Sequence, residues 1–453
     1  NKHYFLFTHW NFHCEYNGHH VISCRITTDL DKQIELAFGE DIDTSFTYSV
    51  TWEEVSISVH DRLMYHVRRL VRSQPLEVHW LSTLNSFILV ILVTAFVTLV
   101  FTTILRQDCA RYHELVIMTR DDLEDVSDPG WKQLKRDVFR PPKNILLFSS
   151  IIGCGTQLLV LMISLLLLSL IGLFYPGNRG SIISSIIFVY CFTSGIAGHV
   201  SSTLYKRFGG NKWATLSILT ATIFTGPFFI IFAIVNSIAW YYQSSIALPF
   251  ITIMSIFGLW LVVTLPLTIY ASRRVFKQQF NNNNNIDEST EELISKVPRE
   301  IPKLAWYRSS YLQIILSGIL PFTAIYIELH FLFMAIFGHQ VYTLFGILSL
   351  AFIMLLIVTC AVTIGLTYFQ LQSEDWRWWW TSLFTAGSTG IYIFAYSIFY
   401  YIYRSYMSGI LQAAIFFGYI SIVSYSFLLT LGATGWWTTY LFLKQIYGAI
   451  KSE

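Results

Sequence analysis

The stretch SYLQIILSGILPFTAIYIELHFLFMAIFG, residues 310–338, decides the fold of this chain. Tyrosines apart, its only titratable side chains are the carboxylate of Glu328 and the imidazole of His330. At about 1.5 Å per residue, a helix of this length crosses the roughly 30 Å hydrocarbon core of a bilayer. Pro321 frees a backbone carbonyl near the middle, and because lipid cannot satisfy it, a neighbouring helix or an internal water must face that point. The stretch therefore predicts a membrane helix inside a bundle.

The composition of the whole chain indicates the same class. Of its 453 residues, 54% are hydrophobic and only 13% are charged, whereas a soluble domain carries about twice that charged fraction. The formal net charge of +2 gives no sign of a nucleic-acid partner, and we expect no cofactor. Because the chain opens at Asn1 without an initiator Met or a signal-peptide pattern, we expect it to be a processed or truncated product.

Residues 1–80 differ in character from the rest of the chain. Short runs such as His20 to Thr28 and Ser45 to Trp52 alternate polar and apolar positions, and Asn17-Gly18 is a turn signal. These patterns predict strands of a water-facing domain. Because so few apolar residues would make a marginal core, we expect the segment to be the C-terminal part of a larger β-rich domain.

From residue 81 onward, apolar runs long enough to span a bilayer follow one another. Two long hydrophilic loops interrupt them, 106–144 and 273–308, and the second contains the low-complexity run Asn281 to Asn285. The predicted fold class is an all-α polytopic membrane protein, with a nine-helix transmembrane bundle in residues 81–453 after the β-rich domain. The predicted spans are 83–105, 145–174, 181–205, 214–240, 246–271, 311–337, 341–370, 379–403 and 409–443.

The distribution of Lys and Arg predicts the orientation of the bundle. The loops after spans one, three, five and seven, together with the C-terminal tail, hold twenty-one of these residues. The loops after the even-numbered spans hold only Arg179 and Arg404. Since short cytosolic loops are enriched in Lys and Arg, we expect residues 1–80 to be lumenal or extracellular and the two long loops and the C-terminal tail to be cytosolic.

Glu328 is the strongest candidate for a functional group. A carboxylate at this depth costs on the order of 2.5 to 3.5 kcal/mol on insertion scales, so it either marks a proton or cation pathway or holds helices together by hydrogen bonding. His330 lies about 200° around the helix, so the two do not line one narrow path. His199 and Gln157 are the other buried polar groups that could pair with Glu328. No nucleophile, base and orienting acid share a suitable spacing, and we expect no enzymatic activity.

Five histidines are concentrated in the N-terminal segment, and His-rich tracts can bind zinc or copper. Only His9 and His13 have the i, i+4 spacing of a helical metal pair, and this spacing fails if the region is a strand. We therefore assign no metal site. The five residues are His3, His9, His13, His19 and His20.

Cys14 and Cys24 lie on the side of the membrane predicted to be oxidising and could form a disulfide, whereas the other four cysteines fall in membrane or cytosol. A two-residue turn at Asn17-Gly18 would place Val21 opposite Cys14. A disulfide therefore requires a wider connection than that turn.

Small and aromatic residues also follow helix-related patterns. Small side chains at spacings of four let helices approach closely in lipid, and we expect this packing role for Ser194, Gly198 and Ser202 and for Ala386 with Gly390. Tryptophans at a span end are typical of an interfacial aromatic belt. We expect that role for Trp376 and Trp378 to Trp380.

Several long motifs in fixed order resemble the nonaspanin family, also called the transmembrane 9 superfamily. The resemblance covers nearly the whole chain, from FTYSVTW at residues 46–52 to the last residue. The motifs are HWLSTLNSF at 79–87, GWKQLKRDVFRPP at 130–142, PREIPKLAWYRSS at 298–310, ILPFTAIYIELHF at 319–331, LTYFQLQSEDWRWWW at 366–380 and a terminal K-x-E.

The resemblance implies residence in Golgi and endosomal membranes and a role in sorting other membrane proteins, in adhesion and in phagocytosis. It also implies a large lumenal N-terminal domain and a coat-dependent Golgi retention signal, which falls here on Lys451 and Glu453. The partners would be lipid, cargo membrane proteins and cytosolic coat proteins. A transporter or channel that uses Glu328 as a coupling site is the alternative, and nine spans with mid-span prolines at 227, 266 and 321 would permit it.

Overall fold

The computed structural model describes most of the chain and arranges it in two compact units. The first comprises Asn1–Trp80, Tyr175–Arg179 and Leu332–Thr343, and the second comprises Leu81–Phe174, Gly180–Phe331 and Leu344–Glu453. The described residues are 4–29, 31, 33–36, 43–62, 65, 76–117, 131, 134–135, 137–174, 179–280, 299, 301–302, 310–337, 345–405, 407 and 409–449.

The first unit contains two small sheets. A central strand, β2 (His9–Asn17), pairs antiparallel with β3 (His20–Thr28) and parallel with β5 (Thr47–Glu54). The strands β1 (Tyr4–Phe7) and β4 (Gln33–Leu36) form a separate antiparallel pair, and a short 3-10 helix, η1, follows at Val59–Asp61. Both predicted strand regions are therefore present, and the small sheet region at the N-terminus is confirmed.

The register of the β2–β3 hairpin differs from the predicted one. The turn lies at Gly18-His19, where Gly18 adopts a left-handed φ of +59° that glycine tolerates without steric cost. A register shift between Glu15 and Tyr16 then inserts an extra residue, so that Cys14 faces Cys24. The turn is therefore one residue later than the Asn17-Gly18 signal predicts, and this displacement together with the β-bulge places Cys24, and not Val21, opposite Cys14.

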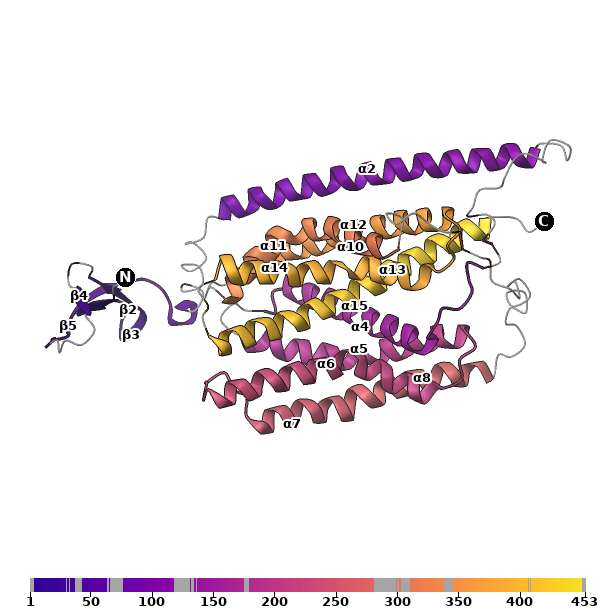
Figure 1. Cartoon of the computed structure of the whole chain (residues 1–453). Coiled ribbons are helices and arrows are strands. Elements are labelled where there is room, and N and C mark those ends of the chain that lie inside the picture. Colours follow the sequence, from indigo (N-terminus) through magenta and orange to yellow (C-terminus); the bar gives the residue numbers. More distant parts are fainter. Residues whose placement is uncertain are drawn as a thin grey trace. The chain divides into compact units, whose positions relative to one another are not determined.

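The second unit is a helical bundle whose rods lie side by side (Figure 1). Among the described residues, nine helical segments are long and apolar enough to cross a membrane, which confirms the predicted fold class. Its elements are α2 (Leu76–Ile117), α4 (Ile145–Leu170), α5 (Arg179–Arg207), α6 (Trp213–Tyr241), α7 (Phe250–Leu259), η3 (Trp260–Thr264), α8 (Leu265–Phe280), α10 (Ser310–Ser317), α11 (Ile319–Phe337), α12 (Phe345–Gln372), α13 (Trp378–Gly387), α14 (Thr389–Tyr403) and α15 (Ile410–Ala449).

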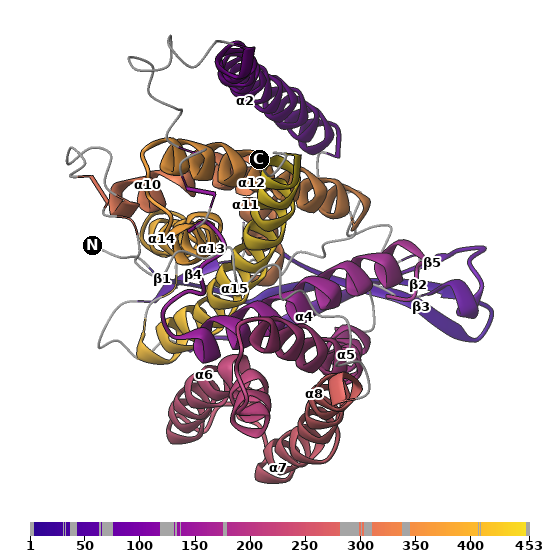
Figure 2. The ribbon, with the colours of Figure 1, turned by 90° about the vertical axis from the view of Figure 1, so that its right-hand side faces the viewer.

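Several helices extend beyond the predicted spans. The helix α2 continues to Ile117, twelve residues into the predicted 106–144 loop, α8 continues past residue 271 to Phe280, and α15 continues past residue 443 to Ala449. The difference arises because hydropathy reports the apolar part of a helix, whereas backbone hydrogen bonding continues into the polar residues that follow. The helix α15 packs against α4, α6, α12, α13 and α14, and Figure 2 shows it between the first two and the last two of these.

The tryptophans at the start of α13 lie inside the protein. Trp378 and Trp379 are 0% and 3% exposed, so the expectation that they belong to an interfacial belt was wrong. Trp379 stacks near Trp436 of α15, and the Trp378 indole donates a hydrogen bond to the carbonyl of Val138 over 2.8 Å. The described residues of the first hydrophilic segment therefore cover these two rings within an aromatic core at one end of the bundle, whereas Trp376 and Trp380 are only partly buried.

Glycines mark the closest helix contacts. A Cβ on Gly155 of α4 would lie 2.2 Å from the carbonyl oxygen of Leu429 in α15. A Cβ on Gly198 of α5 would lie 2.4 Å from the carbonyl oxygen of Thr268 in α8. Both contacts are backbone against backbone and cannot be relieved by a rotamer change. The packing role expected for Gly198 is thus seen in the structure.

We predict that Gly155→Ala lowers the free energy of unfolding by about 1 to 3 kcal/mol, because α4 and α15 must separate to admit the methyl group. Gly365 of α12 is the matched control, since it is also a buried helical glycine but a Cβ there would have no neighbour within 4 Å. Gly365→Ala should leave stability unchanged or raise it by up to about 1 kcal/mol. Thermal midpoints in detergent measure both, and equal midpoints would contradict the close contact.

Candidate functional site

Two membrane-spanning rods are broken at the same level and face each other. One rod changes from α10 to α11 at Gly318, and the other changes from α13 to α14 at Ser388. A Cβ on Gly318 would meet the Ser388 hydroxyl at 2.6 Å, and the Ser317 and Ser388 hydroxyls are 3.2 Å apart. Figure 1 shows the two rods side by side. The neighbour that Pro321 requires is therefore the second broken rod.

Two serine hydroxyls, one from each broken rod, satisfy one backbone carbonyl at the break in the eighth span. Ser317 donates to the carbonyl of Thr385 over 2.9 Å, and Ser388 donates to the same carbonyl over 2.8 Å. Both serines are nearly fully buried. Because lipid offers no hydrogen-bond partner, these bonds are what allows non-helical backbone at this depth.

Glu328 is buried and hydrogen-bonded within the second unit. Its side chain is 4% exposed, and the hydroxyl of Thr83 in α2 donates to its Oε1 over 3.0 Å. Thr83 is itself 2% exposed. The sequence signal that could have identified Thr83 is the group of polar residues, Ser82, Thr83, Asn85 and Ser86, at the start of the first span. This bond joins the first span to the sixth.

His330 points to a different neighbour, as its rotation around the helix predicts. Its Nδ1 is 2.9 Å from the hydroxyl of Tyr396 in α14, and its ring lies against Tyr400. Tyr326 of α11 also packs edge-on against Tyr396. One imidazole and three phenol side chains thus lie along the contact between α11 and α14, whereas Glu328 faces α2.

The other two polar candidates lie elsewhere in the bundle. The Gln157 amide donates to the carbonyl of Tyr190 over 2.9 Å and so joins α4 to α5. The side chain of His199 is exposed on α5. The expectation that His199 is a buried group was therefore wrong. The structure places Thr83 beside the Glu328 carboxylate, whereas His330 and Gln157 face other helices.

Two histidines of the first unit form hydrogen bonds between neighbouring strands of the sheet. The Nδ1 atoms of His9 and His13, both on β2, are within 2.7 Å of the hydroxyls of Thr47 and Thr51 on β5. Because both lie on a strand, the helical metal-binding spacing does not form. No group of three or more metal-ligating side chains occurs in the described part of the chain, and His3 lies outside it.

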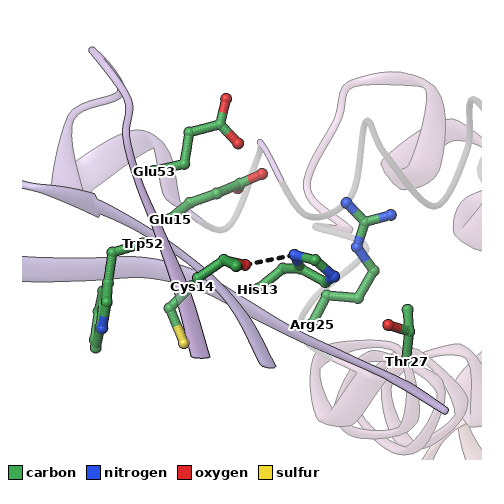
Figure 3. Close-up of a pocket in the computed structure, with 8 residues that line it drawn as sticks. His13, Cys14, Glu15, Arg25, Thr27, Trp52 and Glu53 are labelled. Atoms are coloured by element: carbon green, nitrogen blue, oxygen red, sulfur yellow. Dashed lines mark hydrogen bonds between the residues drawn. The ribbon is translucent and has the colours of Figure 1, made fainter. Parts of the chain in front are cut away.

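The same sheet carries a pocket of about 390 Å³ (Figure 3). In Figure 3, Glu15 and Glu53 extend to one side of the strands, and Trp52 and the Cys14 sulfur extend to the other. The Cys14 and Cys24 sulfurs are 2.6 Å apart as free thiols, and their hydrogen bond raises the pKa of the Cys14 thiol. The disulfide stays a prediction. The pocket is lined by His13, Cys14, Glu15, Arg25, Thr27, Thr51, Trp52 and Glu53.

Comparison with known proteins identifies the family. A family model described as Endomembrane protein 70 matches residues 1–410. The chain is 40% identical over 453 residues to Transmembrane 9 superfamily member 4 of Arabidopsis thaliana, which covers 99% of the chain and 74% of that relative. This chain belongs to the transmembrane 9 superfamily.

Other relatives of this transmembrane 9 superfamily chain come from distant organisms. Transmembrane 9 superfamily member 1 of Bos taurus is 38% identical over 454 residues, with 99% of the chain and 74% of the relative covered. Putative phagocytic receptor 1b of Dictyostelium discoideum is 40% identical over 453 residues, with 100% and 76% covered. No solved structure matches the chain.

We predict that Glu328→Gln preserves the fold, because the amide retains an acceptor oxygen for Thr83. Glu328→Lys should prevent folding, since it replaces that acceptor with a donor and places a cation inside the bundle at a cost of about 2.5 to 3.5 kcal/mol. Thr83→Val, the matched loss of the donor, should lower stability by about 0.6 to 1.7 kcal/mol. Size-exclusion profiles and thermal midpoints in detergent measure all three. A folded, monodisperse Glu328→Lys protein would contradict the buried position.

Proposed function

We propose that this chain is a non-enzymatic trafficking factor that sorts or chaperones other membrane proteins in Golgi and endosomal membranes, with roles in adhesion or phagocytosis. The observation that carries this proposal is the near-full-length similarity to the transmembrane 9 superfamily. The name of the Dictyostelium relative, a putative phagocytic receptor, supports the phagocytic role.

The bundle supports the proposal by presenting apolar helix faces that other membrane spans can contact. In the most apolar 18 residues of the first span only 6% are buried, against 61% in the eighth. Leu92, Phe96 and Leu99 of α2 each expose more than half of their surface. In a bilayer such a face contacts either lipid or the span of another protein. Because lipid is itself apolar, close packing and not the hydrophobic effect would make the protein span the preferred neighbour. The cargo would therefore bind laterally, within the membrane.

The proposed orientation places residues 1–80 in the lumen and the C-terminal tail in the cytosol. It is supported by the twenty-one to two distribution of Lys and Arg. The tail would then carry the coat-binding retention signal at Lys451 and Glu453, two residues that lie outside the described part of the chain. Cytosolic coat proteins and cargo membrane proteins are the proposed partners.

A transporter is the second candidate, and the facing helix breaks favour it. Discontinuous helices near the middle of the membrane line the substrate sites of many secondary transporters, and a buried carboxylate, Glu328, lies on one of the two broken rods. Uptake by reconstituted vesicles separates the two functions. If the proton-linked flux of a solute is lost in folded Glu328→Gln but kept in His199→Gln, the transporter is correct. A wild-type protein without such flux favours the sorting factor.

We predict that Lys451→Ser combined with Glu453→Ser folds normally but leaves the Golgi for later compartments. An exposed charge pair contributes only about 0 to 1 kcal/mol to stability, so the bundle should be unaffected while coat binding is lost. Colocalisation of the tagged protein with a Golgi marker measures the change.

Lys444→Ser is the matched control for this double variant. Lys444 is an exposed cation of α15 that precedes the signal, so its loss should leave the protein in the Golgi. A double variant that stays in the Golgi at wild-type levels would assign residence to the membrane spans or the N-terminal domain. A C-terminal tag that is protected from protease in sealed microsomes would contradict the orientation itself.

A further inference from the structure

A long central part of the sequence contains no acidic residue. No Asp or Glu occurs between Asp137 and Asp287, yet nine Lys and Arg residues occur there, and six of them form two short clusters, at 206–212 and 273–277. The six, called the basic patch below, are Lys206, Arg207, Lys212, Arg273, Arg274 and Lys277.

The fold brings the two clusters to the same end of neighbouring helices. The ammonium group of Lys206, in the last turn of α5, donates to the carbonyl of Val275 in α8 over 2.7 Å and lies 5.8 Å from the centre of the Phe276 ring. Deeper in the bundle, the hydroxyl of Ser272 donates to the carbonyl of Gly198 over 3.2 Å. Because these contacts join α5 to α8, the cations at the two helix ends lie together.

The remaining members of the basic patch surround this junction. Lys212 directly precedes α6, which packs against α8. The guanidinium group of Arg207 lies 5.1 Å from the centre of the Tyr440 ring of α15 and donates to its hydroxyl. Arg273, Arg274 and Lys277 are exposed. Lys206 and Arg207 are thus held by protein contacts, and the other four side chains are available to a ligand.

None of the six cations forms an ion pair with a carboxylate among the described residues. Other arginines at this end of the bundle do: Arg140 pairs with Asp137 at 2.8 Å, Arg299 with Glu374 at 2.9 Å and Arg377 with Asp375 at 3.1 Å. Helix C-termini favour cations in their last turn, and the rule that cytosolic loops are basic explains their side of the membrane. Neither effect explains why the described carboxylates pair with Arg140, Arg299 and Arg377 and with none of the six cations of the basic patch.

We propose that the basic patch binds the headgroup of a phosphoinositide in the membrane leaflet at this end of the bundle. Each phosphomonoester carries a charge of about −1.5 to −2 at neutral pH and three acceptor oxygens, so a phosphorylated inositol ring suits several converging cations better than a singly charged headgroup does. Basic pockets between transmembrane helices bind such headgroups. The assignment of this leaflet to the cytosolic side rests on the orientation proposed above.

The test measures lipid binding by the purified full chain in detergent. Dioctanoyl phosphatidylinositol bisphosphate is added to wild type, and dioctanoyl phosphatidylserine and phosphatidylcholine are added in parallel, with bound lipid counted by native mass spectrometry. The test variant is Arg273→Gln with Arg274→Gln and Lys277→Gln, all exposed. The control variant is Lys135→Gln with Lys143→Gln and Lys444→Gln, which removes the same charge from positions outside the basic patch.

We expect the phosphoinositide to bind wild type and the control variant alike and the test variant about 100-fold more weakly, because each cation near the lipid surface contributes about one kcal/mol. Phosphatidylserine should bind wild type more weakly than the phosphoinositide. Equal binding of the phosphoinositide and phosphatidylserine, or equal loss in both variants, would overturn the proposal, because either result indicates unspecific attraction. Since binding in detergent depends neither on orientation nor on sorting, a negative result would leave the proposed function standing.

Discussion

A hydrocarbon solvent offers no hydrogen-bond partner to a backbone amide or carbonyl, and the rest of this structure depends on that constraint. It requires continuous helices across the membrane. A helix can be interrupted there only where a polar neighbour forms hydrogen bonds with the backbone groups that lose their partners. Where the sixth span is broken at Gly318, the eighth span is broken at Ser388, and the hydroxyls of Ser317 and Ser388 both donate to the carbonyl of Thr385 in the eighth span. In the fifth span the chain instead accommodates Pro266 with a π-helical turn, Trp260–Thr264, just before it. The sixth span is thus interrupted beside a second broken helix, whereas the fifth span stays helical through a local π-helical turn.

Close packing in lipid depends on small residues and on aromatic rings at different depths. Gly155 and Gly198 let backbones touch in the middle of the bundle, where side chains would hold helices apart. At one end, the rings of Phe148, Trp379 and Trp436 pack in a buried cluster that the first hydrophilic segment covers. That end of the bundle consequently has a buried aromatic core, beside which the carboxylates of Asp137 and Asp375 are also buried.

The arrangement of polar groups bears on both candidate functions. Glu328 joins the sixth span to the first, whose outer face is almost uncovered, while His330 joins the sixth span to the eighth. A carboxylate that holds a peripheral helix in place suits a protein whose first span meets other membrane proteins. The same carboxylate on a broken rod suits a coupling site. The two functions differ in whether this bond stays closed or opens during the working cycle.

The sequence by itself determined the class, the number and the approximate bounds of the spans, because the free energy of membrane insertion is nearly a sum over residues in one segment. It also identified Glu328 as exceptional, since an intramembrane carboxylate is costly wherever it points. Only the tertiary structure decided that Thr83 binds it from 245 positions away, that Trp378 and Trp379 are buried, and that Cys24 faces Cys14. These three outcomes depend on how each helix is rotated about its axis, on which loop folds over a helix end and on a single bulge. Such choices are made by contacts between distant segments, which neither hydropathy nor local spacing records.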